Sequence, residues 1–190
     1  MLQYPRRYDL MKKEQIRKLV FSALFLALGF VLPFFTGQVL EIGQKLLPMH
    51  IPVLLCGFVC GWPYGLLVGF ITPLLRSLIF TMPPMYPIAV AMAFELAAYG
   101  ALTGIFYKIL PKKPTFIYIS LVLSMIGGRI IWGITQTVLL GIGGKTFAWT
   151  AFVAGAFVNA VPGIILQLIL IPVLLIALKD AGLFGRDNKL

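Results

Sequence analysis

Polar and charged side chains that a lipid bilayer disfavours stand inside the apolar stretches of this chain, and their types suit the binding of a small anion. Arg76 and Arg129 could each hold a carboxylate through paired hydrogen bonds, and Glu95 could neutralise one of the two cations. His50, at the start of an apolar run, and Asn159, inside another, add a ring nitrogen and an amide. Charges within a membrane span cost about 2.5–3.5 kcal/mol each on insertion scales, so they face a bundle interior or a cavity. The set therefore predicts a polar site enclosed by apolar helices.

Helical spacing brings several of these residues onto shared faces. Arg129, Trp132 and Gln136 follow one another at intervals of three and four residues, which places a cation, an indole and an amide on one side of a helix. Glu95 and Tyr99 are four residues apart and share a face of another helix. The connection 83–87 is rich in proline, which fixes φ, and carries an aromatic ring at its tip. We expect these residues to bind the substrate: His50, Arg76, Tyr86, Glu95, Tyr99, Arg129, Trp132, Gln136 and Asn159.

The two arginines have alternative uses. Either one can neutralise Glu95, because a paired buried charge is tolerable where a lone one is costly. The other then lacks an acidic partner within the membrane, since Glu41 belongs to an external connection, and this predicts an anionic ligand. Arg76 lies nearer the outer end of its helix and is expected to bind the ligand's carboxylate. Arg129 lies deeper, where pairing with Glu95 or bridging between helices is expected. For His50, a hydrogen-bonded role at a helix start competes with a role in the site.

The composition defines the class of protein. Of 190 residues, 60% are hydrophobic and only 12% are charged, and the mean hydropathy is +0.98. A soluble domain carries about 25% charged residues, so this chain is an integral membrane protein and not a soluble enzyme, a secreted disulfide scaffold or a disordered protein. The net charge of +10 is expected to meet anionic lipid and not nucleic acid. Cys56 and Cys60 lack the CxxC spacing of a metal or redox site and are expected to be buried thiols.

Runs of about 20 apolar residues define the transmembrane segments. We expect an all-α fold in one domain, residues 1–190, with six transmembrane helices at approximately 16–35, 46–61, 64–80, 87–110, 115–142 and 147–178. Basic residues gather at 6–18, 108–113 and 179–189, which all fall on one side of the membrane when the chain crosses it six times. By the positive-inside rule that side is the cytoplasm, so both termini are expected to be cytoplasmic. The external connections are then 37–45, 81–86 and 143–146.

Signatures of catalysis are missing from the sequence. It contains no HExxH, GxSxG or P-loop motif, and its single histidine with scattered carboxylates supplies neither a metal site nor a nucleophile with its base. We therefore expect a protein that is not an enzyme, with no catalytic residues, metal or cofactor.

Two stretches carry a resemblance to a known family. The sequence resembles the substrate-binding (S) component of energy-coupling factor (ECF) vitamin transporters in residues 47–57, LPMHIPVLLCG, and 69–77, GFITPLLRS. The overall layout, with a basic N-terminus and an AxxxA face at Ala23 and Ala27, resembles this family as well. The nearest likeness is to the pantothenate branch. The resemblance implies a six-helix bundle that binds its vitamin near the outer side, under the connections between helices one and two, three and four, and five and six.

The resemblance also implies partners. These are a transmembrane coupling subunit, onto which Ala23 and Ala27 would dock, and two cytoplasmic ATPases that would hydrolyse the ATP. The protein would lie in the plasma membrane of a prokaryote as a multi-pass subunit.

Other functions and uses remain open. The substrate could be another vitamin or precursor, such as folate, riboflavin, biotin or a queuosine precursor. A self-sufficient carrier or channel for small solutes would also use charges within the membrane, and a membrane-embedded enzyme is the last alternative. The small face of the first helix could instead serve packing within the chain.

Overall fold

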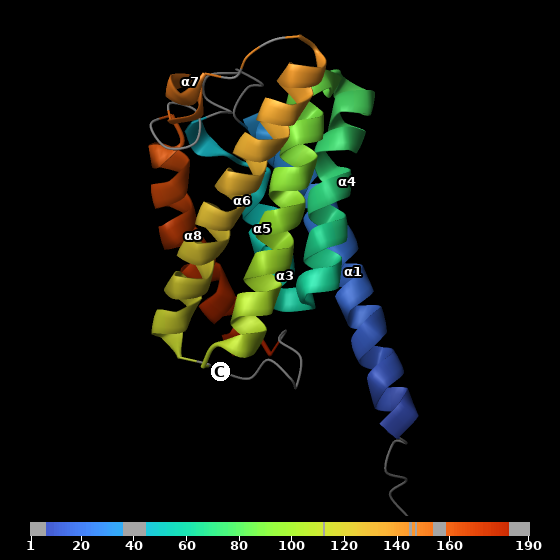
Figure 1. Ribbon diagram of the computed structural model, residues 1–190. Helices are drawn as coiled ribbons and strands as arrows, with labels where there is room; N and C mark the ends of the chain where they lie inside the picture. The colour runs from blue at the N-terminus through green and yellow to red at the C-terminus, as the bar shows by residue number, and fades with distance from the viewer. Residues whose placement is uncertain are drawn as a thin grey trace, which may run out of the picture.

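A computed structural model describes residues 7–35, 45–111, 113–144, 146, 148–153 and 159–182, and every regular element within them is helical. Figure 1 shows the long helices standing side by side as a bundle, from which the first part of α1 projects. The elements are α1 (Arg7–Phe35), α3 (His50–Cys60), α4 (Trp62–Phe80), the π-helical turn η1 (Met85–Ala89), α5 (Val90–Ile109), α6 (Pro114–Ile142), α7 (Trp149–Val153) and α8 (Val161–Asp180). The all-α prediction is confirmed for this part of the chain.

Five stretches of the described helices are long and apolar enough to cross a membrane: Met11–Phe35, Trp62–Phe80, Met85–Ile109, Pro114–Ile142 and Val161–Asp180. Their number and hydropathy fit a multi-pass membrane protein. The second predicted segment differs, because α3 has only 11 residues. At 1.5 Å per residue it covers about 16 Å, roughly half of a hydrocarbon core. Five of the six predicted segments therefore meet the length of a span.

The short helix α3 lies at the centre of the bundle. All of its residues are buried, and it packs against α1, α4, α5 and α8. Its sequence is apolar all round because protein surrounds it, which is the pattern of a buried helix. The α3–α4 junction is a single residue, Gly61, whose φ of 92° lies in the left-handed region that favours glycine.

The last predicted segment is not one continuous helix from 147 to 178. The structure has α7 at Trp149–Val153 and a separate α8 that begins at Val161, after a turn at residues 159 and 160. Pro162 stands in the first turn of α8, where its missing N–H is tolerated, and this favours a helix start at that point. Residues 154–158 lie outside the described part of the chain. The first helix also differs, since α1 begins at Arg7 and not near residue 16.

Glycines let α4 and α5 approach closely. A Cβ atom added to Gly100 of α5 would stand 2.8 Å from the Cα atom of Gly65 on α4, and one added to Gly69 would meet the backbone of Leu96 and Ala97. Only a residue without a side chain fits at such contacts, which are typical of helix packing within membranes. The close pair α4–α5 carries two charged residues that the sequence analysis selected, Arg76 and Glu95.

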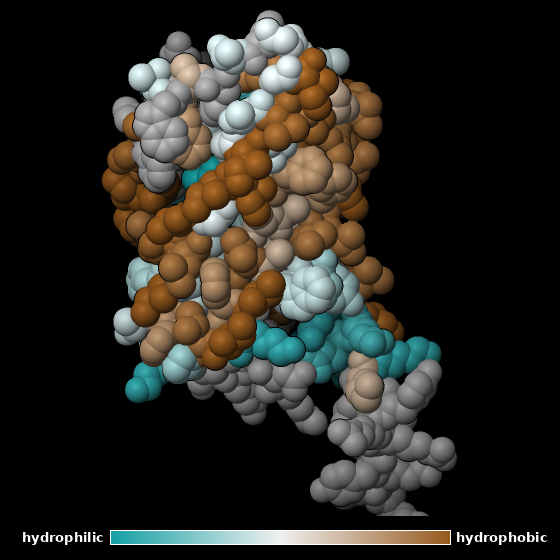
Figure 2. Space-filling view, viewed as in Figure 1, coloured by the Kyte–Doolittle hydropathy of each residue, from teal (hydrophilic) through white to brown (hydrophobic). Residues whose placement is uncertain are grey.

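The two ends of the bundle differ in charge. The start of α1, the α5–α6 connection and the end of α8 lie at one end, the lower end in Figure 1. We call this the basic end, because it carries Lys12, Lys13, Lys108, Lys113 and Lys179, all exposed. Figure 2 shows hydrophilic residues gathered at this end, below a surface that is mostly hydrophobic. The turn η1, the end of α6 and α7 lie at the opposite end.

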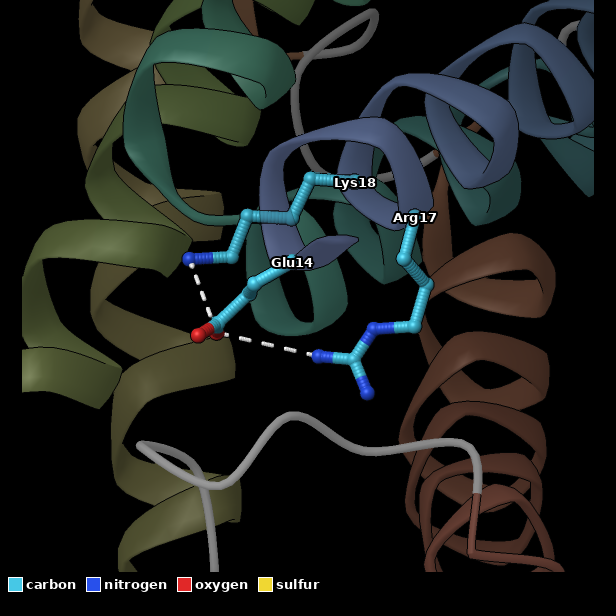
Figure 3. A network of polar contacts seen from close by, with 3 residues as sticks. All are labelled: Glu14, Arg17 and Lys18. Carbon is cyan, nitrogen blue, oxygen red and sulfur yellow. Dashed lines mark ion pairs between the residues drawn. The ribbon is translucent and has the colours of Figure 1, made fainter. Parts of the chain in front are cut away.

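A small ion-pair network lies in the first half of α1. Glu14 Oε1 lies 3.7 Å from an Arg17 guanidinium nitrogen and 3.4 Å from Lys18 Nζ, as Figure 3 shows. These side chains are about one quarter to one third exposed, so water screens the charges. Such pairs contribute about 0–1 kcal/mol to stability.

Candidate functional site

Three charged or titratable side chains from three helices meet inside the bundle. Glu95 on α5 forms an ion pair with Arg129 of α6, whose Nη1 lies 2.8 Å from Glu95 Oε1. His50, the first residue of α3, approaches the same carboxylate oxygen with Nε2 at 3.5 Å. Their exposed fractions are 2% for His50, 1% for Glu95 and 6% for Arg129. We call these residues the Glu95 cluster.

Tyr99 forms one wall of the cluster. Its ring stands edge to face against the His50 imidazole, with centroids 5.2 Å apart, and its side chain is in polar contact with Glu95. Glu95 and Tyr99 meet the same partners because they are one helical turn apart on α5. Gly128 leaves room for the ring, since a Cβ there would stand 2.9 Å from the tyrosine carbons. Its neighbour Arg129 can therefore lie close to α5.

The cluster contains polar atoms that are not satisfied. Among the described residues, Arg129 Nε and Nη2, both ring nitrogens of His50 and Glu95 Oε1 have no hydrogen-bond partner, although all five atoms are buried. Buried polar groups in proteins are nearly always hydrogen-bonded, because an unmade bond costs about 1–3 kcal/mol. The unpaired N–H groups of Arg129 can therefore donate hydrogen bonds to a polar ligand.

Arg76 lies apart from the Glu95 cluster. Its Nη1 donates a 2.7 Å hydrogen bond to the carbonyl of Phe30 on α1. The guanidinium also stands over the rings of Phe34 and Phe80, 5.0 and 5.3 Å from their centroids. Carbonyl and ring faces both attract a cation, so this buried arginine is compensated without a carboxylate. Of the two pairings that the sequence allowed for Glu95, the structure shows the one with Arg129.

Two of the predicted site residues, Trp132 and Gln136, lie on α6, and Tyr86 of η1 contacts the end of this helix. Trp132 stacks on Phe152 of α7, with ring centroids 6.1 Å apart. Gln136, one turn further along α6, has a buried Oε1 with no partner in the described part of the chain. The Tyr86 hydroxyl of η1 donates to the carbonyl of Leu139. The turn η1 and α7 thus both contact the last part of α6.

Asn159 and the two alanines of α1 are exposed. Asn159 lies in the turn before α8, so the prediction that placed it within a helix is wrong. Among the described residues, no ion pair or hydrogen bond joins it to the Glu95 cluster. Ala23 and Ala27 face outward, while their neighbours Ser22 and Phe25 are buried. Ala23 and Ala27 of α1 are therefore accessible at the surface of the described part of the chain.

Gln167 is a buried polar residue that the sequence analysis missed. It is 1% exposed, and its Nε2 has no partner in the described ranges. Gly163, Gln167, Ile171 and Leu175 follow at intervals of four and form the buried face of α8. A Cβ on Gly163 would stand 2.6 Å from the Lys45 carbonyl oxygen, so this face lies beside the chain that leads into α3. A signal was present, because Gln167 is the one polar side chain between residues 161 and 178.

Comparison with known proteins identifies the class. The family model of the ECF transporter substrate-specific component matches residues 17–175, and the chain belongs to this family. It is thus a substrate-specific membrane subunit of an ECF transporter, and the family consists of substrate-binding transport subunits, not enzymes. Membership implies partnership with ECF coupling and ATPase subunits. Comparisons with curated proteins and with solved structures found no match.

Proposed function

We propose that this subunit binds an anionic vitamin, and that the vitamin is pantothenate. The observation that carries the proposal is the Glu95 cluster, in which the buried guanidinium of Arg129 keeps two N–H donors without a partner in the described residues. Donors left unpaired in an apolar interior are costly, and an acidic ligand would supply two acceptor oxygens for them. The cluster belongs to a subunit whose family binds substrates.

The remaining polar groups suit the rest of pantothenate, which has one carboxylate together with amide and hydroxyl groups. Gln136 offers a buried amide oxygen to a hydroxyl, and Gln167 offers a buried amide N–H to a carbonyl. Trp132, one turn before Gln136 on α6, would supply an apolar wall. We place the substrate among the residues selected from the sequence, with Gln167 added. The mixture of an apolar lining and a few polar groups is typical of small-molecule sites.

We further propose that the chain crosses a prokaryotic plasma membrane six times, with both termini in the cytoplasm. The gathering of lysines at the basic end supports this orientation through the positive-inside rule. Cysteines introduced at Lys12 and Lys113 test it, since the native Cys56 and Cys60 are buried. A maleimide that does not cross membranes should label the introduced thiols only after the cells are opened. Labelling of either residue in intact cells would contradict the orientation.

The exposed face around Ala23 and Ala27 is proposed to dock on the coupling subunit. Both residues are exposed on a helix of which the larger neighbours Leu19, Val20 and Leu24 are exposed as well. Small residues allow close approach of a second transmembrane helix. This use is consistent with the partners that the family implies.

Ligand binding by the purified subunit tests the proposed function. The detergent-solubilised protein is titrated by calorimetry, without ATP, against pantothenate, folate, riboflavin, biotin and a queuosine precursor. We expect submicromolar binding of pantothenate, and mass spectrometry of the purified protein should find the same compound bound. Tight binding of a different vitamin would overturn the assignment of pantothenate. Transport into proteoliposomes that lack the coupling and ATPase subunits would instead indicate a self-sufficient carrier.

A further inference from the structure

We propose, on the basis of the function proposed above, that the substrate's carboxylate binds the free edge of Arg129 and that its binding brings one proton onto His50. The site would then take up an acid as an anion together with a proton from the bulk solution. The inference rests on the geometry of the guanidinium and on the charge balance of the Glu95 cluster.

The guanidinium of Arg129 presents one occupied and one open edge. Nη1 is held by Glu95 Oε1 at 2.8 Å, whereas Nε and Nη2 have no partner among the described residues. In a guanidinium, Nε–H and one N–H of Nη2 point in parallel, which matches the two oxygens of a carboxylate. The open edge is therefore the part of Arg129 that can hold an acid side-on. Glu95 acts as a positioning residue, because it holds the group by its other nitrogen.

Charge balance requires a further positive charge when the acid binds. Before binding, Arg129 and Glu95 compensate each other in a site where their exposed fractions are 6% and 1%. A second carboxylate would leave two anions and one cation in a nearly water-free interior, and an uncompensated buried charge is strongly disfavoured. His50 lies 3.5 Å from Glu95 Oε1 and is 2% exposed. Protonation of its imidazole yields two balanced pairs, His50 with Glu95 and Arg129 with the substrate.

Charge balance also requires the His50 imidazole to be neutral in the site without substrate. A protonated imidazole beside the Arg129–Glu95 pair would give the empty site a net positive charge without a counterion among the described residues. The transfer involves no covalent bond to the substrate. One proton leaves bulk water and adds to the unprotonated ring nitrogen of the neutral His50 imidazole, and it returns to water when the substrate leaves.

Few other charged groups of the described residues face His50. From α5 it meets Glu95 and Tyr99, and from α6 it is near Arg129. On α1, the charged residues lie toward the other end of α3, since Ser22 contacts Cys56 and donates back to the carbonyl of Lys18. On α4, Arg76 is turned toward the Phe30 carbonyl of α1. On α8, the buried face beside α3 carries the uncharged Gln167, and the charged residues Lys179 and Asp180 end the helix.

Calorimetry in two buffers of different ionisation enthalpy measures the proton directly. The purified wild-type subunit is titrated at about pH 7.5–8, where a free histidine is neutral, with pantothenate and with its uncharged alcohol. We expect uptake that approaches one proton per bound acid and no uptake with the alcohol. If pantothenate does not bind, the tightest acid of the vitamin panel and its neutral amide take their places. Binding of no acid at all would overturn the proposed function, whereas tight binding of an acid without proton uptake would overturn only this inference.

Two variants and one control assign the groups. His50→Gln should abolish the proton uptake and weaken acid binding about 10–100-fold, while the alcohol still binds as in the wild type and so reports a folded site. Arg129→Gln should remove the preference for acid over alcohol. Arg17→Gln, which removes an arginine from the ion-pair network of α1, should change neither quantity. Unchanged proton uptake in His50→Gln would place the proton elsewhere and refute the proposal. Loss of acid preference in Arg76→Gln, with its retention in Arg129→Gln, would refute the assignment of the carboxylate.

Discussion

The substitution Glu95→Gln should destabilise the subunit strongly because it leaves a buried cation without its counterion. Glutamine keeps the shape of the side chain, removes the charge and replaces one carboxylate oxygen with an NH2 donor. In the wild type, Arg129 Nη1 lies 2.8 Å from the Glu95 carboxylate, and both side chains are almost fully buried. The variant keeps one amide oxygen as an acceptor for Arg129, but the ion pair is lost.

The distance and burial set the expected magnitude. Two unit charges at this separation attract by about 6 kcal/mol at an effective dielectric constant of about 20. Part of that attraction offsets the cost of removing both charges from water, and loss of one partner of a buried pair typically costs about 3–5 kcal/mol. We therefore expect Glu95→Gln to lower the free energy of unfolding by about 3–5 kcal/mol, which is a fall of about 10 °C in Tm for a chain of this size. The double variant Glu95→Gln/Arg129→Gln should recover about 2 kcal/mol or more, because no unpaired charge then remains.

Thermal unfolding in detergent or nanodiscs, without substrate, provides the assay. The matched control is Glu14→Gln, which removes a carboxylate from the partly exposed ion pairs with Arg17 and Lys18 and should change the free energy of unfolding by less than about 1 kcal/mol. Equal losses for Glu95→Gln and Glu14→Gln would refute the reasoning. A double variant that is less stable than the sum of its single changes would refute it as well, because the coupling would then have the wrong sign.

Three further predictions concern packing, assembly and the second arginine. Gly100→Ala should lower the free energy of unfolding by about 1–3 kcal/mol or prevent assembly of the bundle, because its Cβ would meet the α4 backbone. The control Gly141→Ala, whose Cβ meets nothing within 4 Å, should be neutral or stabilising, and equal Tm values for the two variants would contradict this prediction. Ala23→Trp should weaken co-purification with the coupling subunit and leave vitamin binding intact, while the control Val173→Trp on the exposed face of α8 should change neither property. Normal assembly of the Ala23 variant would show that the coupling subunit docks elsewhere. Arg76→Met should lower the free energy of unfolding by about 1.5–3 kcal/mol through loss of its charged hydrogen bond to α1, and an unchanged Tm would show that this contact adds no stability.

Much of the fold could be predicted from the sequence because hydropathy and charge are local properties. Three of the six predicted helices, 64–80, 87–110 and 115–142, agree with α4, α5 and α6 to within three residues at both ends. The first, 16–35, agrees with α1 at its end. The exceptions have physical causes. The apolar run at 46–61 fits a buried helix as well as a span, since protein and lipid are both apolar surroundings. The run at 147–178 contains the break between α7 and α8, which hydropathy does not reveal because the residues on both sides are apolar.

The sequence by itself determined that this is a helical membrane protein, which residues are polar within it, and which family its motifs resemble. These conclusions depend on the identity of residues along the chain and on the cost of placing charge in lipid. Only the tertiary structure decided that Arg129, and not Arg76, meets Glu95, that His50 joins them, and that Gln167 faces inward. Such pairings depend on how each helix is rotated about its axis and on which helix packs against it. Those two quantities follow from contacts between distant parts of the chain, such as Gly65 with Gly100, and no local pattern contains them.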